Sequence, residues 1–117
     1  MLGMSYHEHT DPKFAAKIRA GAPAAFDAWM KFNQASLRNE DGVLSRKTVE
    51  LLAVAVALTT QCPYCLEDHS NAAREAGVTE EELAETIMVA ATLRAGAGLA
   101  HGFVAEKFSH GAEKAAD

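Results

Sequence analysis

The sequence predicts a single-domain, all-helical fold. Apolar residues make up 49% of the 117 residues, and alanine recurs along the whole chain. Only three residues are proline, and apolar side chains return at helical rather than alternating spacing. This length suits one domain but gives a thin core for an isolated monomer built of short helices. We therefore expect one domain over residues 1–117 with about six helices.

Proline and glycine mark the first two helices. Asp11 and Pro12 suit the N-cap and first position of a short helix that continues to about residue 20 and closes at Gly21. Pro23 opens a second helix that runs to about residue 37. Its large apolar side chains at near-helical spacing are predicted to be core: Phe26, Trp29, Met30 and Phe32. Residues 1–11 and 109–117 are expected to be flexible.

The third helix is predicted to be central. Residues 38–42 form a polar turn, and Ser45 is a good N-cap for a helix that runs to residue 60. The apolar content of this helix is nearly all round, as in a helix packed on several sides. The expected buried face consists of Val49, Leu52, Ala53 and Val56.

Two further helices follow, with strong start signals. Pro63 starts a fourth helix that ends at Gly77. Thr79 and Glu82 form a capping box that opens a fifth helix with acidic residues in its first turn. Three glycines, Gly96, Gly98 and Gly102, are expected to interrupt it before a last helical stretch to about residue 108.

Charge and hydropathy narrow the class of partner. A net charge of -5 offers no basic surface for nucleic acid or an anionic membrane. The N-terminus has no basic region followed by an apolar stretch, so we expect a cytoplasmic protein without a targeting peptide. The longest apolar run, residues 51–58, is far short of the ~20 residues that span a bilayer. A small molecule or another protein is the expected partner.

The two cysteines carry the clearest chemical signal. A pair three residues apart in a reducing cytosol favours a catalytic or metal-binding role over a structural disulfide. Cys62, Cys65 and His69 share one face of the fourth helix, because spacings of three and four return to the same side. Cys62 lies at the helix N-terminus, where backbone N–H groups stabilise a thiolate. Cys65 can close a disulfide with it, in either order of roles, and His69 is the candidate base.

Glu50, twelve residues before Cys62, is the candidate partner of His69. Apolar residues flank it in the third helix, and a carboxylate there is costly unless it faces solvent or a polar site. An alternative is a zinc site built from the two cysteines and His69, with His101, Glu50 or the arm containing His7 and His9 supplying a further ligand. The sequence offers only one such cluster, on a helix, which favours redox chemistry over metal binding.

The segment from residue 45 to residue 102 resembles the core of the alkylhydroperoxidase D (AhpD)-like proteins of the carboxymuconolactone decarboxylase superfamily. The resemblance rests on a glutamate, twelve residues, and then Cys-x-x-Cys-x-x-x-His, followed by the Ala-Gly-Val-Thr-Glu segment at residues 76–80. It implies a helical fold that assembles as a homotrimer or homohexamer, and a peroxidase that draws electrons from a protein or small dithiol. Within it, Cys62 and Cys65 match the redox pair, and His69 and Glu50 match the proton relay. The resemblance implies no cofactor.

One residue departs from that pattern. The best-characterised members carry a second histidine directly before the second cysteine, where this chain has Tyr64. A phenol is a poor base at neutral pH but can donate a hydrogen bond, so Tyr64 is a secondary candidate. We predict a peroxide- or disulfide-reducing enzyme; the alternatives are a non-redox decarboxylase of the same superfamily and a zinc-stabilised interaction module.

Overall fold

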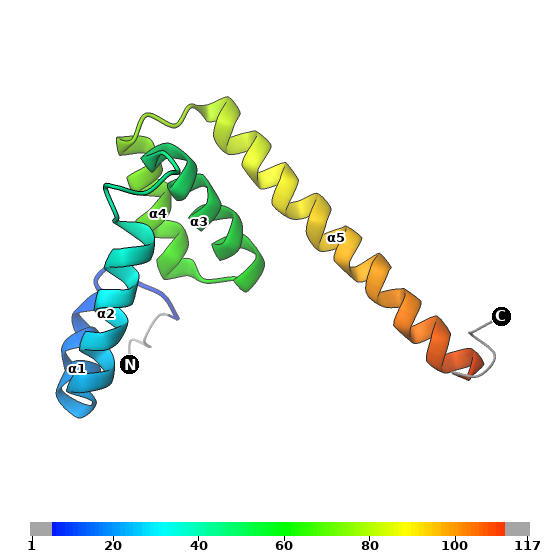
Figure 1. Cartoon of the computed structure of the whole chain (residues 1–117), viewed down its shortest axis with the longest axis horizontal. Helices are drawn as coiled ribbons and strands as arrows, with labels where there is room; N and C mark the ends of the chain where they lie inside the picture. Colours follow the sequence, from blue (N-terminus) through cyan, green and yellow to red (C-terminus); the bar gives the residue numbers. More distant parts are fainter. Residues whose placement is uncertain (1–5, 112–117) are drawn as a thin grey trace, which may run out of the picture.

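The structure is a computed structural model that describes residues 6–111, and every regular element in this range is helical. A short 3-10 helix, η1 (Asp11–Phe14), runs into α1 (Ala15–Gly21), which forms a hairpin with α2 (Pro23–Leu37). The other helices are α3 (Arg46–Thr60), α4 (Pro63–Glu75) and α5 (Glu80–His110). In Figure 1, α3 and α4 lie side by side at the centre, with the α1–α2 hairpin and α5 extending from them. The expected flexibility of residues 1–5 and 112–117 lies outside the described residues.

The start signals in the sequence correspond to real caps. Ser45 Oγ accepts a hydrogen bond from the Thr48 N–H at the start of α3, at 3.1 Å. At the start of α5, Thr79 and Glu82 form the complete capping box. One cap differs, because Thr10 rather than Asp11 occupies the N-cap of η1. The Asp11 carboxylate instead accepts hydrogen bonds from the Glu8 N–H and from another helix, as described below.

The expected break in the last helix is wrong. Helix α5 continues without interruption through Gly96, Gly98 and Gly102 to His110. A glycine inside a helix costs about 1 kcal/mol relative to alanine, but it does not end the helix unless the backbone turns there. The glycines that do adopt positive φ are Gly77, after α4, and Gly111, after α5. Alanines and leucines surround the internal glycines, so the segment keeps its helical bonds.

The core of the single chain is small. Among the described residues, four apolar ones are buried: Val54 and Ala57 of α3, Ala73 of α4 and Ala90 of α5. The predicted core role of the α2 side chains is wrong for three of them, since Trp29 is 55% exposed, Met30 46% and Phe32 68%, while Phe26 is half-buried. These side chains have the spacing of a buried face, but no other element of the described chain packs on most of that face.

The buried face of α3 also differs from the prediction. The buried residues are Glu50, Val54 and Ala57, whereas Leu52 and Val56 are exposed. Residues 50, 54 and 57 follow the i, i+4, i+7 spacing of one helical face. Because α3 is apolar nearly all round, periodicity alone could not select the face that meets α4.

The chain exposes much more surface than a compact monomer. Its accessible surface is 9337 Å², against roughly 6,200 Å² for a folded monomer of this mass. Its radius of gyration is 19.5 Å, against about 13 Å for a compact domain of this length. Much of the extension comes from α5, whose far half runs away from the other helices (Figure 1).

Helix α5 also corrects the expectation that no apolar segment is long enough to cross a bilayer. Its 31 residues contain an 18-residue window with a mean hydropathy of 1.4, of which 6% is buried. By length and composition alone this helix could span a membrane. A helix at the core of a protein assembly can have the same length and composition. The hydropathy of α5 therefore identifies an uncovered apolar surface, but it does not identify what covers that surface.

Candidate functional site

A tight turn places the two cysteines at the start of α4. Helix α3 ends at Thr60, and its C-cap Gln61 adopts the left-handed conformation with φ 58°. The Cys62 N–H still donates to the Ala57 carbonyl. The chain therefore reverses within two residues. Cys62 is the N-cap of α4, and its Sγ accepts a hydrogen bond from the Cys65 N–H at 3.2 Å. The predicted position of Cys62 at a helix N-terminus is confirmed.

The structure joins Cys62 and Cys65 in a disulfide, with their Cα atoms 5.3 Å apart. Both side chains are half-buried. The loop that the bond closes is one helical turn, so it constrains little of the unfolded chain. The helix N-terminus, by contrast, supplies N–H donors and partial positive charge that stabilise a thiolate when the bond is reduced.

Glu50 and His69 form a buried pair between α3 and α4. Glu50 is 0% exposed, and its Oε2 lies 2.7 Å from His69 Nδ1. Burial alone would raise the pKa of Glu50, but hydrogen bonds from His69 and Arg38 outweigh it and lower the pKa below its ordinary value of 4.5. The ionised carboxylate only accepts, so Nδ1 carries the imidazole proton. Nε2 of the neutral ring is then left as the proton acceptor.

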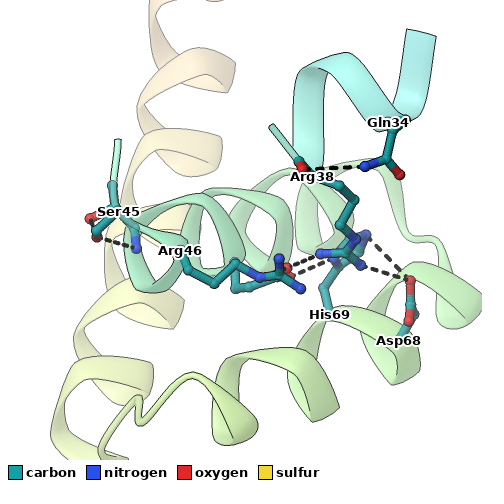
Figure 2. A network of polar contacts seen from close by, with 8 residues as sticks. Gln34, Arg38, Ser45, Arg46, Asp68 and His69 are labelled. Atoms are coloured by element: carbon teal, nitrogen blue, oxygen red, sulfur yellow. Dashed lines mark hydrogen bonds and ion pairs between the residues drawn. The ribbon is translucent and has the colours of Figure 1, made fainter. Parts of the chain in front are cut away.

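Two arginines that were not among the predicted site residues complete this cluster. Arg38, directly after α2, donates a hydrogen bond to Glu50 Oε1. Arg46, in the first turn of α3, forms an ion pair with the same oxygen, with its Nε at 3.1 Å. Arg38 also lies 3.9 Å from Asp68 Oδ2. Figure 2 shows Arg38 reaching from the end of α2 toward His69 and Asp68 on α4. The spacing of four between Arg46 and Glu50 was a usable signal, whereas Arg38 lies in a polar turn with no distinguishing pattern.

The Tyr64 hydroxyl is held by residues that precede α1. Its hydroxyl donates to Asp11 Oδ2 at 2.8 Å and lies 3.3 Å from the Tyr6 carbonyl oxygen. Its ring meets the His7 ring edge-on at 4.6 Å. The hydrogen bond to Asp11, followed by burial, raises the pKa of Tyr64. Tyr64 thus ties the segment before α1 to the first turn of α4.

A hollow of 780 Å³ lies next to this contact. Tyr64 lines it together with η1, α1 and Glu8, and the lining includes the apolar side chains of Phe14 and Ile18. Its acidic lining residues are Glu8 and Asp11. The space is large enough for an organic molecule beside the helix turn that carries the cysteines.

The proposed zinc ligands do not converge in the described part of the chain. Within residues 6–111, no group of three His, Cys, Asp or Glu side chains has the arrangement of a metal site. His101 lies on the far half of α5, and Glu50 is already held by two arginines and His69.

The fold and site define a small all-helical protein with a disulfide-forming Cys-x-x-Cys pair beside a buried Glu–His pair. A model of the carboxymuconolactone decarboxylase family matches residues 23–106. The chain belongs to this family, which includes the AhpD-like proteins as well as carboxymuconolactone decarboxylase. It is also 45% identical over 94 residues to "Uncharacterized protein 4 in cox locus" of Paracoccus denitrificans, a match that covers 77% of this chain and 82% of the relative.

Proposed function

We propose that the protein is a thiol-dependent peroxidase or disulfide reductase. The observation that carries the proposal is the Cys62–Cys65 disulfide at the start of α4, one turn before His69, which is itself held by buried Glu50. Family membership and the cysteine pair both fit redox chemistry of the AhpD-like type. A decarboxylase would have no use for a thiol pair that closes a disulfide.

The proposed cycle uses four groups. The Nε2 atom of neutral His69 accepts the proton of one thiol, and Glu50 stabilises the resulting imidazolium. The thiolate attacks one oxygen of a hydroperoxide; the O–O bond breaks, an alcohol leaves with the proton from His69, and a sulfenic acid remains. The second thiol attacks that sulfur, water leaves and the disulfide forms. A protein or small dithiol then reduces the disulfide and is itself oxidised.

A mass measurement tests this proposal directly. The fully reduced protein is treated with one equivalent of an organic hydroperoxide, and intact mass and free thiol content are followed. We expect a loss of two daltons, loss of both thiols and recovery of both by a dithiol. Thiols that stay unreactive would contradict redox function, and stoichiometric zinc in the purified protein would support the interaction-module alternative instead.

We also propose that a second copy of the chain covers the apolar surface of α5, as part of a homotrimer or homohexamer. The excess over a compact monomer is about 3,000 Å², within the range that obligate subunit interfaces bury. The most exposed of its large apolar residues are Met88, Leu93, Leu99, Phe103 and Phe108. We further propose that the protein is cytoplasmic and acts on a small-molecule oxidant, and that it binds neither nucleic acid nor a membrane.

Charge placed on α5 should break the assembly. We expect Phe103→Glu to lower the mass measured by sedimentation equilibrium from a multimer to a monomer, because a buried unpaired carboxylate is costly at an apolar interface. The control is Lys107→Glu, one turn further on, which changes charge without removing apolar surface. A parent protein that is monomeric at micromolar concentration, or that partitions into neutral phosphatidylcholine vesicles, would contradict a second copy as the partner of α5.

A further inference from the structure

The buried carboxylate of Glu50 has more positive partners than an orienting group needs. A single hydrogen bond to His69 Nδ1 is enough to fix the imidazole tautomer. Two guanidinium groups nevertheless converge on the other carboxylate oxygen, Oε1. They come from different parts of the chain, Arg46 from α3 itself and Arg38 from the segment that follows α2.

The charges around His69 balance only when Arg38 is present. Within residues 6–111, the fixed charges at ion-pair distance from His69 or Glu50 are two carboxylates, Glu50 and Asp68, and two guanidiniums, Arg38 and Arg46. Asp68 Oδ2 lies 3.7 Å from His69 Nε2, and Arg38 Nη2 lies 3.9 Å from the same oxygen. Arg38 therefore pairs with both carboxylates that flank the imidazole, Glu50 and Asp68. Without it, one uncompensated negative charge would remain next to His69.

We infer that Arg38 is a positioning residue that keeps His69 neutral and its Nε2 free to accept a proton. An uncompensated carboxylate beside a histidine favours the imidazolium, and a histidine that is already protonated cannot accept the proton of a thiol. Arg38 suits this role better than Arg46. The Arg38 side chain is 24% exposed and the Arg46 side chain is 53% exposed, so solvent screens the charge of Arg38 less. The catalytic consequence rests on the proposed function, whereas the charge balance does not.

The experiment is an NMR titration of His69 in the full chain labelled on the histidine rings, with its signal assigned through a His69→Gln variant. We expect Arg38→Gln to move the protonation midpoint of His69 upward by on the order of one pH unit. Arg46→Gln should move it in the same direction by less. Arg74→Gln is the matched control. Arg74 lies on α4, as His69 does, but its guanidinium donates to the exposed Asn71, so this variant should leave the His69 midpoint unchanged.

Two further results separate this inference from the proposed function. Arg38→Lys should restore most of the parent midpoint, since it returns the charge. The acidic limb of the pH–rate profile for hydroperoxide consumption should move upward in Arg38→Gln by the same amount as the His69 midpoint. An unchanged midpoint in Arg38→Gln would overturn the role of Arg38, whatever the result for Arg46→Gln. A shifted midpoint with an unmoved rate profile would support that role and contradict His69 as the base.

Discussion

Replacing either Cys62 or Cys65 by serine is expected to abolish catalytic turnover of hydroperoxide, with a loss of roughly a thousand-fold or more. Each variant lacks one half of the disulfide that closes the proposed cycle. Neither should unfold, because the bond closes only one turn of α4 and both side chains are half-buried. Steady-state hydroperoxide consumption with a dithiol donor measures the loss.

The two serine variants also show which sulfur attacks. The variant that keeps the attacking cysteine should form a sulfenic acid with one equivalent of hydroperoxide, seen as a gain of one oxygen in the intact mass and trapped by dimedone. The other variant should not. The control is Ser70→Ala, which alters α4 next to His69 without touching sulfur. Turnover that persists in either cysteine variant would contradict the two-cysteine cycle.

The second large effect is expected for Glu50→Gln, which should slow hydroperoxide consumption by about 10²-fold, the scale of a general-base contribution. Glutamine keeps the shape of the side chain but cannot compensate the imidazolium that forms on His69. The variant also leaves Arg38 and Arg46 without their shared carboxylate. Breaking such a buried pair costs about 3 kcal/mol of stability, so rates are measured well below the unfolding temperature.

The stability effect of Glu50 depends on pH in a defined direction. Its pKa is lowered in the folded protein, so the unfolded chain binds the proton more readily. The stabilisation that ionised Glu50 provides is therefore complete at pH values above its ordinary pKa of 4.5. It is lost as the pH falls through the lower pKa that Glu50 has in the folded protein. Urea unfolding of the parent and Glu50→Gln should differ at pH 7 and converge toward pH 3.

A matched control for this pair of measurements is Glu85→Gln on the exposed surface of α5. It removes the same charge and should change neither the rate nor the urea midpoint by a measurable amount. A stability gap between the parent and Glu50→Gln that stays constant between pH 7 and pH 3 would show that the carboxylate is not held ionised in the fold.

Local signals in the sequence were sufficient for most of the helices and for the core of the candidate site. Ser45, Pro63 and the Thr79–Glu82 box mark the starts of α3, α4 and α5, because capping depends on side chains within one turn of each start. The position of Cys62 at the N-cap of α4, with Cys65 and His69 four residues apart further along the same helix, was equally predictable, since it depends on local signals and the helix repeat. The relation of Glu50 to His69 needed family resemblance as well, because the two lie on different helices.

Tertiary structure decided everything that depends on which surfaces meet. It made α5 one continuous helix, left Trp29 and Phe32 exposed, and selected the face of α3 that carries Glu50 inward. It also brought Arg38 onto Glu50 and Asp11 onto Tyr64, across 12 and 53 residues of sequence. The sequence by itself determined the helices and the chemistry of the cysteine turn, since these follow from bonding within a few residues. The charge balance around His69 comes from contacts between helices, which no local pattern encodes.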